Sequence, residues 1–395
     1  MLGPEGRGLM GLLIAIALLC SLVGVGGLPA AIAHAVAVAG APARDVVRGN
    51  LRFWAALLLV PSVVASGIAG VLVRDEPDAW LLAALCGVLC YLLALNFLFA
   101  AMLQGEGNVR RINLQRVVGM ASYVAVIAVM FMVWPTDRAG YVVGVYALSL
   151  VGGVIMCLAF LRPSTHDPSV IARRADVHAF ARRGWISGLN ALDGLGVDQL
   201  LVGLVLGQTA LGLYAVAVSI TSFPSLVLTG VAAVLLPRMA AAGARGSVGV
   251  MRSWLAAAAV LNVTMIIGIE IVVAPALRIF FGEDFVPATA VARVLAIAWG
   301  FLAMRRLLTA AAQAQGKVAK ASLAEAAVTV LFVVSAVVLM HVWDLEGAAA
   351  AMLLAGVVFC VWVGSALSWR RPAGEHVDVE LSDVAELDDA DHRML

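Results

Sequence analysis

Residues 182–240 decide the fold: RRGWISGLNALDGLGVDQLLVGLVLGQTALGLYAVAVSITSFPSLVLTGVAAVLLPRMA. This stretch reads as two long apolar helices joined by a very short turn at 207–209. Each helix is long enough to cross the roughly 30 Å of hydrocarbon in a bilayer at about 1.5 Å per residue. The first carries Asp193 and Asp198 at the expected depth of lipid, where an ionisable group is by default a candidate for function.

The whole chain has the composition of a membrane protein. Of its 395 residues, 63% are hydrophobic and only 13% are charged, whereas a soluble domain carries roughly 25% charged residues. Its apolar runs are continuous rather than alternating, which predicts an all-α polytopic fold and argues against a membrane barrel. About eleven spans are expected, over residues 9–35, 51–73, 79–103, 114–134, 140–161, 184–206, 210–236, 253–276, 287–312, 320–342 and 346–368.

The distribution of arginine and lysine predicts how the chain is oriented. One set of alternate loops is rich in arginine and includes both lysines of the chain, and the opposite set holds only Arg7, Arg74, Arg138 and Arg278. Loops rich in positive charge stay in the cytoplasm. We therefore expect a multi-pass protein of the cytoplasmic membrane, with residue 1 outside and the C-terminus in the cytoplasm.

One short motif occurs twice and predicts an internal repeat. The pattern Leu-Gly-x-x-x-x-Gly-Leu stands at residues 2–9 and again at 206–213, an offset of 204 for both pairs. Parallel repeats are a known architecture of transporters, so two pseudo-symmetric helical bundles are predicted. A whole helix precedes the second copy and nothing precedes the first. We therefore hypothesise that a first helix is missing, by truncation or a misassigned start codon; chance similarity of two glycine turns is the alternative.

The chain is predicted to divide into four parts. An N-terminal bundle of five spans covers 1–161, and a C-terminal bundle of six spans covers 184–369. The basic, amphipathic segment 162–183 between them is expected to be a cytoplasmic linker lying at the membrane interface. The tail, 370–395, is rich in Asp and Glu and is expected to be disordered and solvated.

Motifs for nucleotide or metal chemistry are absent from the sequence. The GxxxxG spacing at 207–212 is followed by Leu213 and Tyr214 rather than by the Lys and Ser/Thr of a P-loop. The six histidines have no metal-ligand spacing. No metal, cofactor or nucleic-acid partner is therefore expected. The predicted outer loops are short and carry no acid/base cluster, which argues against an enzyme.

Charged side chains interrupt two of the predicted spans. Arg305 and Arg306 lie about 10–15 Å from the predicted cytoplasmic end of their span. Because a guanidinium binds phosphate oxygens well, we hypothesise that they contact a pyrophosphate in a central cavity. The alternative is that both side chains snorkel to the membrane surface. Asp193 and Asp198 are each interpreted as ion-coupling or cavity-lining residues, with a structural ion pair or hydrogen bond between helices as the alternative. They point about 140° apart on the helix, so they do not form one carboxylate pair. Asn190 shares a helix face with Asp193 and is a further candidate for substrate binding.

Several short stretches together resemble one family of transporters. They are DQLLVG at 198–203, LG at 206–207, GLYAVA at 212–217, Pro224 and Pro237, LGPEGRG at 2–8 and FGEDF at 281–285. With the hydrophobic plan of nearly the whole chain, they resemble the polysaccharide-biosynthesis flippases, the O-antigen and teichoic-acid exporter group of the multidrug/oligosaccharidyl-lipid/polysaccharide superfamily. The opening stretch resembles the loop that follows the first helix of that family.

The resemblance implies two six-helix bundles around a central cavity that opens alternately to each side. It implies a glycan linked to polyprenyl pyrophosphate as substrate, moved to the outer leaflet, with the bilayer and glycan-assembly enzymes as partners. Basic cavity residues face the substrate phosphates in such proteins, which adds weight to Arg305 and Arg306. A drug/cation antiporter of the same superfamily is the first alternative, and a membrane glycan polymerase or ligase is the second.

Overall fold

The computed structural model describes residues 3–38, 43–106, 109–133, 139–160, 181, 196–241, 243–315 and 317–367. Within these residues every regular element is helical, which confirms the predicted all-α fold. The first group of helices is α1 (Pro4–Val25), α2 (Leu28–Val38), α3 (Ala43–Leu72), α4 (Ala79–Gly105), α5 (Val109–Val133) and α6 (Ala139–Phe160). The second group is α9 (Val197–Leu206), α10 (Gln208–Thr221), α11 (Phe223–Ala241), α12 (Gly243–Phe280), η2 (Glu283–Phe285), α13 (Ala288–Ala314) and α14 (Val318–Ala366).

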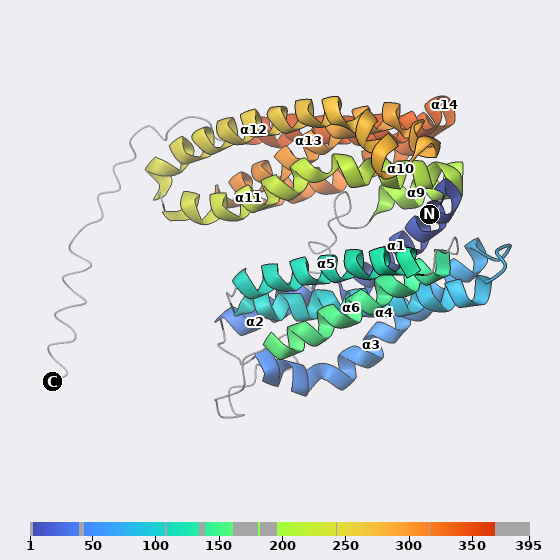
Figure 1. The fold of residues 1–395 in the computed structure, drawn as a ribbon. Coiled ribbons are helices and arrows are strands. Elements are labelled where there is room, and N and C mark those ends of the chain that lie inside the picture. Colours follow the sequence, from blue (N-terminus) through green and yellow to red (C-terminus); the bar gives the residue numbers. More distant parts are fainter. Residues whose placement is uncertain are drawn as a thin grey trace, which may run out of the picture.

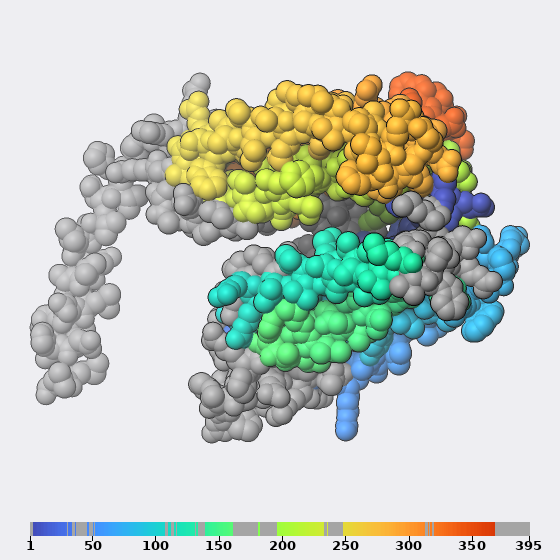
Figure 2. All heavy atoms as spheres, viewed as in Figure 1, coloured from blue at the N-terminus to red at the C-terminus, as the bar shows by residue number. Residues whose placement is uncertain are grey.

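The helices gather into two bundles, which we call the first lobe (α1–α6) and the second lobe (α9–α14) (Figure 1). The lobes meet near the N-terminus, where α1 packs against α9 and α10. We call this region the closed end. Toward the opposite end the lobes diverge, and Figure 2 shows an open cleft between them there. In the same view α11 and α5 border the gap.

The limits of several spans differ from those expected. Seven helices of the described residues are long and apolar enough to cross a membrane, or eight if the bent pair α10–α11 is one span. The predicted span 9–35 is broken at Gly26, whose φ of 48° ends α1. The predicted span 210–236 bends by 45° between α10 and α11. The last two predicted spans form the single element α14, which is interrupted by non-helical dihedrals at Trp343 and Asp344.

Apolar side chains cover the outside of both lobes as well as their interior. Leu13 and Ile16 on α1 are almost fully buried, whereas Val71 on α3 and Ile271 on α12 are about two-thirds exposed, at 68% and 71%. A soluble protein rarely exposes apolar surface on this scale. Surrounding lipid removes that penalty, so the pattern is the one expected of a membrane bundle.

The internal repeat is visible as a reciprocal contact between α1 and α10. A Cβ atom added to Gly8 would lie 1.7 Å from the carbonyl oxygen of Gln208, and one added to Gly212 would lie 1.8 Å from the carbonyl oxygen of Pro4. Positions 4 and 208, and 8 and 212, are each 204 apart, so the two contacts exchange under the repeat. The lobes are therefore pseudo-symmetric about the α1–α10 crossing, as predicted.

Two predicted segments fall on residues whose structure is not described. The linker at 162–183 lies outside the described residues except for Ala181, and the tail at 370–395 lies wholly outside them. In the described part of the chain, α9 has no counterpart in the first lobe.

Candidate functional site

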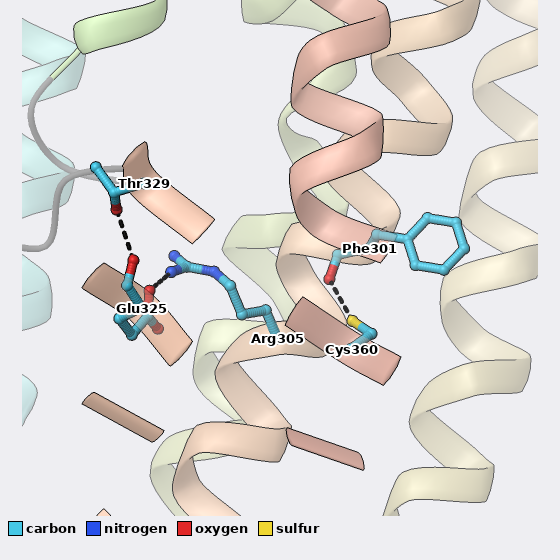
Figure 3. Close-up of polar contacts among 5 residues, drawn as sticks. All are labelled: Phe301, Arg305, Glu325, Thr329 and Cys360. Atoms are coloured by element: carbon cyan, nitrogen blue, oxygen red, sulfur yellow. Dashed lines mark hydrogen bonds and ion pairs between the residues drawn. The ribbon is translucent and has the colours of Figure 1, made fainter. Parts of the chain in front are cut away.

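A buried ion pair joins α13 to α14 in the second lobe. Arg305 is 1% exposed, and its Nη1 atom donates a hydrogen bond to the carboxylate of Glu325 (Figure 3). The guanidinium carbon lies 5.5 Å from the centre of the Phe359 ring. An apolar helix tolerates a guanidinium at this depth because the carboxylate and the ring replace the water that it loses.

Two further hydrogen bonds lie on the same two helices. The Thr329 hydroxyl donates to the Glu325 carbonyl oxygen at 2.8 Å, one helical turn along α14. On the opposite part of α14, the Cys360 thiol donates to the carbonyl oxygen of Phe301 on α13 at 3.4 Å. Glu325 and Cys360, near the two ends of α14, therefore each bond to α13.

The first lobe carries an uncharged version of the same arrangement. Gln115 on α5 donates to the side-chain oxygen of Asn96 on α4 at 3.3 Å, and Asn96 donates to the carbonyl oxygen of Leu150 on α6 at 3.1 Å. The offset of the repeat is 204 between α1 and α10 and 209 between α4 and α13, which are both 27 residues long and begin at Ala79 and Ala288. Asn96 and Arg305 are 209 residues apart and so hold the same position of these two helices. Each lobe thus has a polar side-chain pair at an equivalent position. The pair is neutral in the first lobe, Asn96 with Gln115, and ionic in the second, Arg305 with Glu325.

Arg306 points to a different side of α13 from Arg305, because adjacent residues on a helix are about 100° apart. Its Nη1 atom donates to the hydroxyl of Thr229 on α11. Thr229 is exposed, and its hydroxyl in turn donates to the carbonyl oxygen of Ser225 at 2.6 Å. The bond to Thr229 ties Arg306 to α11, the helix that lies beside the gap between the lobes in Figure 1.

Asp198 lies in the first turn of α9 and is 8% exposed. Its carboxylate contacts the hydroxyl of Tyr214 on α10, which is fully buried and also lies 3.7 Å from the Met352 sulfur on α14. The partial positive charge of a helix N-terminus favours a carboxylate at this place. The other two candidates of this helix, Asn190 and Asp193, lie outside the described residues.

The partners of these residues were less visible in the sequence than the residues themselves. Glu325 lies near the predicted inner end of the span 320–342, and nothing in the sequence pattern names Arg305 as its partner. The spacing did contain a signal for the pair. Arg305 lies 11 residues before position 316 and Glu325 lies 9 residues after it, so a turn there between two antiparallel helices brings the two side chains to a similar height. Tyr214 stood out only as part of a motif. Within the described residues no group of three His, Cys, Asp or Glu side chains is placed to hold a metal ion.

Three comparisons place this geometry among known proteins. The model of the polysaccharide biosynthesis protein family matches residues 1–242. No curated protein matches the chain significantly. Among solved structures, the chain is similar to an inward-facing multidrug resistance MATE family transporter of the MOP superfamily, with 17% identity, a TM-score of 0.66 and coverage of 92% of this chain and 91% of that one.

Two further structures extend the comparison. The lipid II flippase MurJ, in an inward closed conformation, shares 13% identity at a TM-score of 0.65, with 92% of this chain and 85% of that chain covered. An outward-facing MATE transporter of the MOP superfamily shares 19% identity at a lower TM-score of 0.54, over 92% and 88% of the two chains. These neighbours are transporters and flippases built as helical membrane bundles. The chain belongs to the polysaccharide biosynthesis protein family, and its fold is that of these helical membrane bundles.

Proposed function

We propose that this transporter moves a lipid-linked oligosaccharide, carried on polyprenyl pyrophosphate, across the cytoplasmic membrane by alternating access, and that it is not an enzyme. The family match is the observation that carries the proposal, because members are named for polysaccharide biosynthesis. The likeness of fold to a lipid II flippase supports a lipid-linked substrate.

Arg306 is the proposed contact for the substrate phosphates. It donates to the Thr229 hydroxyl of α11, and its guanidinium fork can exchange this one hydroxyl acceptor for two phosphate oxygens. Asn190 is proposed as a further substrate contact. Arg305 is proposed to act through position, because its pairing with Glu325 fixes α13 against α14 and so sets the direction in which Arg306 points.

The closed end of the molecule is proposed to face outward, and the cleft to open to the cytoplasm. Arg7, Arg74 and Arg278, which belong to the poorly charged loops, lie at or near the closed end. The higher TM-score with the inward-facing neighbour, 0.66 against 0.54, supports this assignment. The C-terminus is then cytoplasmic, where glycan-assembly enzymes can deliver the substrate.

Ion coupling is proposed to involve Asp198 and Asp193. A buried carboxylate that contacts a tyrosine hydroxyl can take up a proton or accept a cation without exposure to lipid. The same feature favours the second candidate function, a drug/cation antiporter, which the likeness to MATE transporters also supports.

Translocation in proteoliposomes tests the proposal. A fluorescent polyprenyl-pyrophosphate glycan is loaded in one leaflet, and its arrival in the other is followed by chemical quenching. Wild-type protein should move it, Arg306→Ala should lose at least tenfold in rate, and Arg252→Ala should not, because Arg252 is an exposed arginine on α12. Rapid efflux of an organic cation driven by a proton or sodium gradient, with no movement of the glycan lipid, would refute the flippase and establish the antiporter.

A further inference from the structure

The closed end is held by two loops, each of which reaches from one lobe to the other. The loop between α12 and α13 contacts Arg7 at the start of α1, and the loop between α3 and α4 contacts Gln208 at the start of α10. Under the 204-residue repeat, Gln208 corresponds to Pro4, in the same helical turn as Arg7. Each lobe therefore holds the first turns of the other lobe's leading helix.

Aromatic rings form the first of these contacts. The guanidinium carbon of Arg7 lies 4.6 Å from the centre of the Phe281 ring and 5.3 Å from that of Phe285. Phe285 is 2% exposed, and the Arg7 Nε atom is buried without a hydrogen-bond acceptor. The rings are thus a principal support of this cation.

The loop that carries the rings is itself braced. Gly282, with φ of 97°, turns the chain between the two phenylalanines, whose ring centres are 5.9 Å apart. Arg278 and Glu283 form an ion pair of 2.8 Å across the turn. The turn and the ion pair both lie within the second lobe and do not involve Arg7.

A hydrogen bond forms the second contact. The side-chain amide of Gln208 donates to Glu76 Oε1 at 3.2 Å. It stands beside the crossing at which Gly8 approaches the Gln208 carbonyl. Movement of α1 away from α10 at this crossing separates Arg7 from its rings and Gln208 from Glu76 in the same step.

We propose that these two contacts form a reciprocal clasp that keeps the closed end shut, and that release of Arg7 from Phe281 and Phe285 is the main energetic step in opening it. This inference rests on the proposed alternating-access cycle. When the closed end opens instead, the cleft shown in Figure 2 closes and the clasp separates. The clasp therefore sets the resting equilibrium between the form with the closed end shut and the form with it open.

Distance measurements between spin labels test the clasp directly. Labels are placed at Asp75→Cys in the α3–α4 loop and at Asp284→Cys in η2, both exposed, with the five native cysteines replaced by alanine. Wild-type protein should give one short distance. Arg7→Gln should increase the equilibrium constant for the long-distance form by roughly five- to thirty-fold, as expected for loss of a partly desolvated cation–π contact.

Matched variants separate the clasp from loss of structure. Arg7→Lys keeps a cation over the rings and should restore most of the short distance, whereas Phe281→Leu should reproduce Arg7→Gln, and the two changes together should add little. Arg293→Gln removes an arginine near the same end that pairs with Glu270 inside one lobe, and it should leave the distances unchanged. An Arg7→Gln distribution identical to that of Arg293→Gln would overturn the proposal. Since no substrate is present, this result is independent of which molecule is transported.

Discussion

Replacing Gly8 with alanine should force α1 and α10 apart at the closed end. The new Cβ would lie 1.7 Å from the Gln208 carbonyl oxygen, whereas carbon–oxygen contacts are about 3.3–3.6 Å, so the backbones must separate by roughly 1.6 Å. Neither atom belongs to a flexible side chain, so a rotamer change cannot relieve the clash. We expect a loss of about 1–3 kcal/mol in the free energy of unfolding, the range for overpacked sites.

Gly144→Ala on α6 is the matched control. Nothing lies within 4 Å of a Cβ at this position, so the higher helix propensity of alanine should stabilise the protein by about 0.5–1 kcal/mol. The two substitutions are chemically the same and should change stability in opposite directions. The midpoint of thermal unfolding in detergent, measured by intrinsic fluorescence, distinguishes them.

The repeat sharpens this prediction further. Gly212→Ala meets the Pro4 carbonyl at 1.8 Å and should lower the midpoint by the same amount as Gly8→Ala. The double variant should cost less than the sum, because the first substitution has already separated the helices that the second would push. If Gly8→Ala proved as stable as Gly144→Ala, the close crossing of α1 and α10 would be wrong, and with it the pseudo-symmetry axis placed there.

Two further predictions concern single side chains of the second lobe. Asp198→Asn should leave the thermal midpoint within a few degrees of wild type, because an amide oxygen can still accept a hydrogen bond from the Tyr214 hydroxyl. The same variant should abolish transport driven by a proton or sodium gradient. Unchanged gradient-driven transport would show that Asp198 takes no part in coupling. Asp344→Gly should raise the midpoint, since Asp344 has φ of 46° and ψ of −128°, a conformation that costs a non-glycine residue about 1–3 kcal/mol. A lower midpoint would show that its side chain contributes more than its backbone costs.

The sequence predicted the class of fold and the repeat because both leave regular marks. Apolar runs of spanning length identify a membrane bundle, and the 204-residue offset between two Leu-Gly motifs anticipated the reciprocal contacts of Gly8 and Gly212. The breaks within spans were harder to predict. Gly26 and Gly27 were a visible signal for the end of α1, but the 45° bend before Phe223 depends on how α10 and α11 pack.

The candidate site was predicted in part, for a physical reason. Hydropathy marks a charge such as Arg305 as unusual, since its transfer into lipid is unfavourable. It does not say which neighbour satisfies the charge, because that depends on the rotation of α13 against α14. Arg7 was assigned to an outer loop from charge counting alone, and its contact with Phe281 joins segments more than 270 residues apart.

The two lobes together predict what happens when the buried ion pair is removed. Glu325→Ala leaves the Arg305 guanidinium, 1% exposed, without its carboxylate, and breaking such a pair typically costs about 3–5 kcal/mol. The double variant Arg305→Asn, Glu325→Gln instead copies the pair that the first lobe already uses, where Gln115 donates to Asn96 at 3.3 Å.

The double variant should therefore fold with most of wild-type stability, and should keep translocation if the pair serves to hold α13 against α14. Glu325→Ala should lose both stability and translocation, measured by thermal unfolding and by the proteoliposome assay. A double variant that folds well but moves no substrate would contradict the positioning role. It would mean that the second lobe became ionic because the charge itself takes part in transport, since the neutral first lobe demonstrates that packing alone does not require it.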